Sequence, residues 1–485
     1  MYTLPEIEEE VKELMIGRKE ELETLYLARD ADESGFIAVY GRRRVGKTYL
    51  VRKAFDGDFA FYHTGIANVS KKEQLARFVR SLQKYGLAEK VRPKDWFEAF
   101  DLLSVGLEKL PPGKKVVFID ELPWMDTPKS NFVSALENFW NGWASAREDM
   151  LLIVCGSASS WILSKIVDNH GGLHNRLTDR IHLKPFNLAE CEALAQERGL
   201  AMPRAHVLEA YMIFGGVPYY WTLLKSSLGL AQNVDRLCFC EGGALADEFA
   251  QLYASLFRRP LGHIAVVTAL STKKIGMTRE EVIAATGAED SGALTKVLKE
   301  LEACGFVRKY RIPGCKAKGA IYQLIDNFTL FYFKFLQGDV ERPRDFWSTS
   351  HMSQEVRIWR GLAFERVCLE HVDSIRRTLG IAGVRSRVYA FGFEADLADG
   401  HPGGQIDLVI DRDDDVINLC EMKCLGGEYV IDEAERRKLE NRREAFLRKT
   451  RTSKAVHLTI VSANGTRRNA YAQNLQGLLS ADNLF

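Results

Sequence analysis

Short apolar runs separated by glycines and charged residues recur along the chain, and they predict alternating strands and helices. In the first part, three runs have the length of buried strands: FIAVY at 36–40, VVFI at 116–119 and LLIVC at 151–155. The first of these runs passes through a glycine-bounded loop into a helical pattern that reaches Phe55. This order predicts an α/β domain.

A different pattern fills the middle of the chain. Residues 277–287 are amphipathic, and Thr278 with Glu281 three residues later predicts a capped helix start. A second helix is predicted from apolar residues at helical spacing, and Gly305 ends it; these residues are Leu294, Val297, Leu298 and Leu301. Two strand patterns, 306–312 and 320–325, then flank a turn. Helix, turn, helix and hairpin resemble a winged helix.

Charged residues interrupt apolar strands in the last third. Residues 403–424 read as two strands joined by an acidic turn, with Asp407 in the first and Glu421 and Lys423 at the end of the second. If the turn is the three residues 413–415, the two carboxylates become cross-strand partners, and Lys423 points to the same face. A buried charge is costly unless it is paired or holds a metal. The pattern predicts a metal site; its alternative is a structural Asp–Lys or Glu–Lys pair.

Length, net charge and cysteine count limit the classes of protein to which the chain can belong. At 485 residues the chain should hold about three domains. A net charge of +1 excludes a uniformly basic nucleic-acid coat but not a local basic face. Nine cysteines without zinc-ribbon spacing predict reduced thiols in a cytoplasm. We expect no signal peptide and no membrane span; the aromatic stretch at 328–336 is too short and predicts a core helix.

The loop after the first strand has the spacing of a phosphate cradle. Gly41, Gly46, Lys47 and Thr48 fit G-x-x-x-x-G-K-[ST], so backbone N–H groups would wrap phosphates while Lys47 reaches the β- and γ-phosphates and Thr48 ligates Mg²⁺. We expect the whole loop to contact the nucleotide: Gly41, Arg42, Arg43, Arg44, Val45, Gly46, Lys47, Thr48 and Tyr49.

Two further strands end on polar residues that complete an ATPase site. Asp120 would hold Mg²⁺ through water, and Glu121 would polarise the attacking water. Ser157 follows the third strand, where its hydroxyl would either sense the γ-phosphate or cap the strand end. Together these motifs predict ATP and Mg²⁺ as cofactors.

These strands resemble the AAA+ and STAND branches of P-loop ATPases, and more closely the prokaryotic "archaeal ATPase" family. The resemblance implies that Gly17 and Arg18 lie near the adenine and that Pro218, in GGVPYY, touches the base. It also implies an arginine finger directed at a neighbouring subunit, with Arg176 the first choice and Arg180 the second. The alternative for both arginines is ordinary surface charge. The lid segment lacks a second sensor arginine.

The winged-helix pattern carries basic residues on the elements that meet DNA in this motif. Those on the second helix and on or near the wing are Lys296, Lys299, Arg308, Lys309, Arg311, Lys316 and Lys318. We expect contacts to duplex phosphates, with a protein–protein spacer carrying solvated lysines as the alternative.

The last third resembles the PD-(D/E)xK, or restriction-endonuclease-like, superfamily, and more narrowly the DUF234 domain fused to archaeal-type ATPases. The resemblance implies that Asp407 and Glu421 are metal carboxylates, that Lys423 orients the attacking water and that Glu365 completes the metal shell. Ile406 stands where the namesake proline would be. The arginines of 436–448 would track a DNA backbone or form a salt-bridged surface helix.

The expected fold class is α/β: a P-loop ATPase core at 1–186, a helical lid at 187–258, a winged helix at 259–326, a connector at 327–350 and a nuclease-like domain at 351–485. The leading hypothesis is an ATP-hydrolysing, DNA-binding homo-oligomer with a Mg-dependent nuclease domain, in defence or mobile-element biology. The main alternative is a STAND-like ATPase switch that recruits a protein partner through a non-cutting scaffold. A weaker third hypothesis is a transcription regulator.

Overall fold

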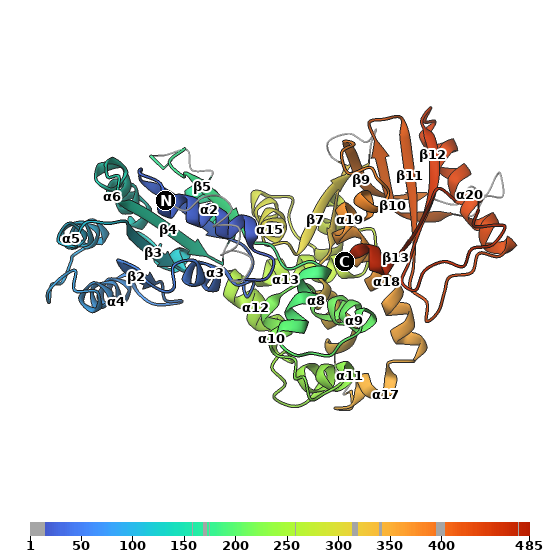
Figure 1. Ribbon diagram of the computed structural model, residues 1–485, viewed down its shortest axis with the longest axis horizontal. Helices are drawn as coiled ribbons and strands as arrows, with labels where there is room; N and C mark the ends of the chain where they lie inside the picture. Colours follow the sequence, from blue (N-terminus) through green and yellow to red (C-terminus); the bar gives the residue numbers. More distant parts are fainter. Residues whose placement is uncertain are drawn as a thin grey trace. The chain divides into compact units, whose positions relative to one another are not determined.

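The computed structural model describes residues 15–157, 159–167, 172–173, 175–257, 259–312, 319–338, 342–393, 403–473 and 475–485. The chain divides into two compact units, Met1–Pro185 and Phe186–Phe485 (Figure 1). The finer predicted domain limits stay predictions. Within the described residues, no helix is long and apolar enough to cross a membrane.

The first unit is built on a five-stranded parallel sheet in the order β2-β3-β4-β1-β5. Its strands are β1 (Gly35–Tyr40), β2 (Phe61–Thr64), β3 (Lys115–Asp120), β4 (Met150–Gly156) and β5 (Asp179–His182). β3 and β4 are buried along their whole length, as strands covered on both faces should be. All three strands predicted for this part are confirmed.

Helices cover both faces of this sheet. One core cluster joins the sheet to α4 (Lys71–Lys84), α5 (Trp96–Glu108) and α6 (Phe132–Gly142), and a second joins it to α2 (Lys19–Asp30) and α3 (Lys47–Ala54). Alternate strand residues belong to alternate clusters: Phe36 and Ala38 to the first, Ile37 and Val39 to the second. In such a sheet, the loops at the carboxyl ends of the strands gather at one edge, where ligands bind.

The second unit opens with short helices: α8 (Leu188–Glu197), α9 (Arg204–Phe214), α10 (Pro218–Thr222), α11 (Leu230–Val234) and α12 (Glu248–Leu256). The aromatic stretch at 328–336 forms α16 (Asn327–Phe331) and a following helical turn, Tyr332–Leu336. Phe328, Phe331 and Phe335 are buried there, which confirms the predicted core helix.

The helices and strands predicted for the winged-helix segment are present in the predicted order, and the name winged helix is kept here for these residues. After α13 (Leu261–Ser271) come β6 (Met277–Thr278), α14 (Arg279–Thr286), α15 (Gly292–Ala303), β7 (Val307–Arg311) and β8 (Ala320–Leu324), with the strands in the order β6-β8-β7. Thr278 and Glu281 form the predicted capping box, and Gly305 takes a left-handed conformation after α15. Residues 313–318 of the wing lie outside the described residues.

The C-terminal part is a mixed sheet in the order β13-β12-β11-β10-β9. Its strands are β9 (Ser386–Phe393), β10 (Gly404–Arg412), β11 (Val416–Lys423), β12 (Ala455–Ser462) and β13 (Gly477–Ser480); the helices are α18 (Gln354–Glu370), α19 (Val372–Thr378) and α20 (Glu433–Thr450). β9, β10 and β11 pair antiparallel, whereas β11, β12 and β13 pair parallel. The predicted turn at 413–415 is confirmed, with Asp415 left-handed.

One core cluster spans the winged helix and the C-terminal sheet. Tyr310 of β7 lies in it together with Tyr389 and Phe391 of β9, and Ile275 and Ile321 pack against it. The Tyr310 hydroxyl also donates to the Ile275 carbonyl at 2.6 Å. The inward face of the wing therefore serves as a packing surface for the C-terminal sheet.

Candidate functional site

The phosphate-cradle loop connects β1 to α3, and its backbone requires glycine at two positions. A Cβ on Gly41 would lie 2.2 Å from the Leu183 carbonyl oxygen, and Gly46 has a φ of +95° directly before the helix starts at Lys47. The helix N-terminus directs free N–H groups into the loop, where they favour an anion. Within the loop, Arg42 and Val45 are buried, Arg44 is left-handed, and Arg43 and Tyr49 are exposed.

Lys47 lies inside its own loop. The ammonium donates to the carbonyls of Gly41 and Arg42, each at 2.9 Å, and the residue is only 5% exposed. A buried ammonium held by carbonyls at a helix N-terminus is placed where the phosphates of a nucleotide would pass.

Thr48 and Asp120 meet at the same edge of the sheet. The Thr48 hydroxyl donates to Asp120 Oδ2 at 2.7 Å, and Asp120 Oδ1 accepts from the Glu121 N–H at 2.8 Å. A hydroxyl and a buried carboxylate supply the oxygen ligands that Mg²⁺ prefers. These residues fit the predicted Mg²⁺ site.

Glu121 is held by a contact that the sequence did not reveal. It is left-handed, with a φ of +48°, and its Oε1 accepts from the Ser157 hydroxyl at 2.8 Å. The sequence offered Ser157 as a phosphate sensor or a strand cap; here it positions the carboxylate of the predicted base. Cys155 was also missed: burial first, then the charge of Asp120, keeps its pKa well above the ordinary value, so the thiol next to this site is neutral.

The residues to which the family resemblance assigns a role differ in burial and in the element that carries them. Arg18 is buried and donates to the Lys184 carbonyl at 2.8 Å, while Gly17 beside it is left-handed and exposed. Arg176 and Arg180 are exposed, and Arg180 lies on β5. Pro218 begins α10 in the second unit. Their roles toward adenine and toward a neighbouring subunit stay predictions.

Four of the basic residues of the winged helix are exposed: Lys296, Lys299, Lys309 and Arg311. Arg308 differs, because its Nε donates to Gln323 Oε1 at 2.6 Å and burial lowers its pKa. Arg308 therefore links β7 to β8. Contact with phosphate stays a prediction for the four exposed residues, and Lys316 and Lys318 lie outside the described residues.

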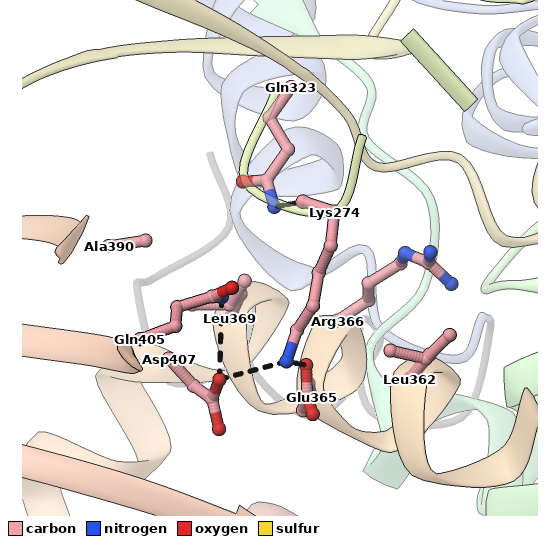
Figure 2. Close-up of a pocket in the computed structure, with 9 residues that line it drawn as sticks. All are labelled: Lys274, Gln323, Leu362, Glu365, Arg366, Leu369, Ala390, Gln405 and Asp407. Atoms are coloured by element: carbon pink, nitrogen blue, oxygen red, sulfur yellow. Dashed lines mark hydrogen bonds and ion pairs between the residues drawn. The ribbon is translucent and has the colours of Figure 1, made fainter. Parts of the chain in front are cut away.

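Asp407 and Glu365 come together around a lysine that sequence reasoning missed (Figure 2). The Lys274 ammonium lies 3.0 Å from Asp407 Oδ1 and 2.5 Å from Glu365 Oε2. Glu365 projects from α18 and Asp407 from β10, whereas Lys274 comes from the turn before β6. Nothing in the sequence around Lys274 distinguishes it from its neighbour Lys273.

The predicted shared face of Asp407 and Glu421 stays a prediction, and the strand pairing near Asp407 is irregular. Ile406 pairs with Phe391 and Val409 with Tyr389, so β10 has an extra residue between them. Ile406 and Val409 lie in one cluster with Phe446 of α20, while Asp407 pairs with Lys274, which also pairs with Glu365 of α18.

Glu421 lies on the α20 side of the sheet, among partners from its own module. It forms ion pairs with Arg442 of α20 and, at 3.0 Å, with Lys423. Lys423 also lies 3.1 Å from Glu435, and these two acids outweigh burial and raise its pKa. Among the described residues, no three His, Cys, Asp or Glu side chains are placed to hold a metal ion.

Glu365 and Lys274 of this cluster have shifted pKa values. Burial, and then the charge of Asp407, raises the pKa of Glu365 to about 7, although Lys274 acts in the opposite direction. Burial disfavours the charge of Lys274, but Asp407 and Glu365 outweigh it and raise its pKa. The cluster thus has two carboxyls around one ammonium.

Comparison with known proteins finds a family profile that matches the first part of the chain. Residues 15–224 match the profile of the ATPase domain predominantly from Archaea. An uncharacterized protein of Methanocaldococcus jannaschii is 24% identical over 408 residues, 83% of this chain and 85% of its own. An uncharacterized ATP-binding protein of the same organism is 48% identical over 40 residues, 8% of this chain and 68% of its own.

Two solved structures match about two thirds of the chain. The Walker-type ATPase PABY2304 of Pyrococcus abyssi matches with a TM-score of 0.47 at 16% identity, over 66% of this chain and 96% of its own. The ORC2 protein of Aeropyrum pernix matches with a TM-score of 0.42 at 14% identity, over 65% of this chain and 92% of its own.

Proposed function

We propose that residues 15–224, which match the profile of the ATPase domain predominantly from Archaea, form an ATP-binding ATPase that works as a switch for the second unit. Hydrolysis is assigned to the edge of the sheet where Lys47, Thr48, Asp120, Glu121 and Ser157 are placed by β1, β3 and β4. The observation that carries the assignment is the pair of hydrogen bonds Thr48–Asp120 and Ser157–Glu121.

Each residue has a distinct task in this mechanism. Lys47 neutralises phosphate charge, and the N-terminus of α3 supplies N–H donors. Thr48 and Asp120 would hold Mg²⁺, which when bound supplies positive charge against the phosphate oxygens. Glu121 accepts a proton from the attacking water or orients it, and Ser157 keeps that carboxylate in place.

Measuring ATP binding separately from hydrolysis tests the proposal. Lys47→Ala should weaken nucleotide binding, because the loop loses its buried ammonium, while Lys53→Ala in the same helix serves as the matched control. Glu121→Gln should retain binding and block turnover. Hydrolysis at the wild-type rate by Glu121→Gln would remove Glu121 from the mechanism.

For the second unit we propose partner recruitment as the leading role. Its support is that Asp407 and Glu421 form ion pairs with partners from different elements, Lys274 for Asp407 and Arg442 for Glu421. Duplex binding through the exposed lysines of α15 and an oligomer formed around Arg176 remain part of the proposal. Their support is exposure alone.

Metal-dependent DNA cleavage is the second candidate. One observation favours it: Glu365 and Asp407, two carboxyls predicted as metal ligands, already meet at Lys274. An assay with and without Mg²⁺, Mn²⁺ and ATP on single- and double-stranded DNA separates the candidates. Cleavage that Asp407→Asn abolishes while ATP hydrolysis survives would favour the nuclease.

A further inference from the structure

Lys274 joins two modules of the second unit through charge. It belongs to the winged helix, in the turn between α13 and β6, yet its ammonium binds Glu365 and Asp407 of the C-terminal module (Figure 2). Glu421 provides the contrast, since Arg442 and Lys423, both from its own module, neutralise it. The ion pairs that Glu365 and Asp407 form with Lys274 therefore depend on the winged helix being docked, while the charge of Arg366 also acts on Glu365 and that of Arg442 on Asp407.

The backbone of Lys274 is held in place from within the winged helix. Its carbonyl accepts from Gln323 Nε2 of β8 at 2.6 Å, and Gln323 Oε1 accepts from Arg308 of β7. The turn that follows requires Gly276, which has a φ of +87° and whose Cβ would lie 2.3 Å from the Tyr322 carbonyl oxygen. Lys274 is thus presented by a defined turn.

The next residue, Ile275, adds apolar contact to the same junction. It packs against the cluster of Tyr310, Tyr389 and Phe391, and its Cδ1 lies 3.4 Å from where a Cβ on Gly392 would stand. Ionic and apolar contacts of the junction therefore come from adjacent residues, and loss of one should weaken the other.

The ion pairs of Lys274 should decide whether the winged helix stays docked on the C-terminal module. The Glu365 and Asp407 side chains are 14% and 8% exposed, and Lys274 is 34% exposed. Removing one partner of a buried ion pair leaves uncompensated charge, which costs more than the pair contributes. Here Asp407 would lose its ion-pair partner, and Glu365 would lose the ammonium that lowers its pKa.

We propose that Lys274 is an intramolecular latch: it holds the winged helix against the C-terminal module and, while docked, closes the Glu365–Asp407 pair to divalent cations. The cation part rests on the second candidate function above; the docking part does not. Release of the latch would expose the acid pair and the inward face of the wing in one step.

Hydrogen–deuterium exchange of the full chain tests the docking part. Lys274→Met keeps the length of the side chain and removes its charge, and amides in β7 and β9 should exchange at least about tenfold faster than in the wild type. Lys273→Met is the matched control, since Lys273 pairs with Glu281 inside the winged helix; it should leave β9 unchanged. If Lys274→Met does not fold, Asp407→Asn should loosen the same segments.

Mn²⁺ binding, followed by electron paramagnetic resonance, tests whether the latch closes the Glu365–Asp407 pair to divalent cations. Lys274→Met should gain a Mn²⁺ site that the wild type lacks, and adding Glu365→Gln should remove it. Unchanged exchange in β7 and β9, or loosened docking without a gained Mn²⁺ site, would overturn the latch. A gained site without DNA cleavage would leave the latch standing and remove only the nuclease candidate.

Discussion

Ser157→Ala is a small change with a defined expected effect on hydrolysis. It removes one hydroxyl from the end of β4, and with it the 2.8 Å hydrogen bond to Glu121 Oε1. A hydrogen bond to a charged group contributes about 1.5–3 kcal/mol. If that free energy orients Glu121 in the transition state, kcat should fall by about 10- to 100-fold at ~1.4 kcal/mol per factor of ten.

The assay follows Mg-ATP hydrolysis and ATP binding separately in the full chain. The ATP dissociation constant should stay within about twofold, because the hydroxyl bonds Glu121 rather than the phosphate loop. Ser157→Thr keeps a hydroxyl and should retain much of the rate. Ser164→Ala, which removes an exposed hydroxyl bonded to the Trp161 carbonyl, is the control. Hydrolysis by Ser157→Ala at the wild-type kcat would refute the positioning role.

Three further predictions concern other parts of the chain. Arg176→Ala should lower hydrolysis more than ATP binding, and mixing it with Glu121→Gln subunits should restore activity if the finger acts between subunits; no rescue in verified mixed oligomers would exclude that. Burial lowers the pKa of His63 from 6.5 to about 4, so the unfolded chain takes up the proton first as the pH falls. Between those pH values the folded state should lose up to roughly 3 kcal/mol, and urea titrations at pH 7 and pH 5 should show a loss that His63→Gln reduces. Joint alanine replacement of the exposed basic residues should weaken duplex binding and flatten its salt dependence, and unchanged binding would contradict a DNA role; these residues are Lys296, Lys299, Lys309 and Arg311.

Local chemistry made the ATPase site predictable from the sequence. The positions of Gly46, Lys47 and Thr48 are set by one strand–loop–helix connection, so spacing alone places them. Asp120 and Glu121 end a buried strand, and parallel order brings that end beside the loop. The Ser157–Glu121 contact was not predictable in the same way, since it depends on β4 lying between β1 and β3.

The cluster of Glu365, Asp407 and Lys274 was only partly predictable from the sequence. The hairpin and its turn follow from apolar pattern and turn length, whereas the approach of Glu365 was implied by the resemblance to the PD-(D/E)xK superfamily. The extra residue between Ile406 and Val409 exists only against β9, a strand that the pattern did not indicate. The contact between Asp407 and Lys274 was not predictable either, because Lys274 comes from a turn that is far away in the sequence.

Strand β7 of the wing can pack against the C-terminal sheet with one face and contact DNA with the other. Along β7 the side chains alternate: Arg308 and Tyr310 are directed to the hairpin and the C-terminal cluster, while Lys309 and Arg311 are exposed. Packing against the C-terminal sheet therefore leaves the basic face open, and a spacer role and a DNA role do not exclude each other. Release of the latch would change only the inward face of the wing and leave its exposed basic residues as they are. If Lys274→Met alters duplex binding, the effect must therefore come from a changed placement of the winged helix and not from a change in its charge.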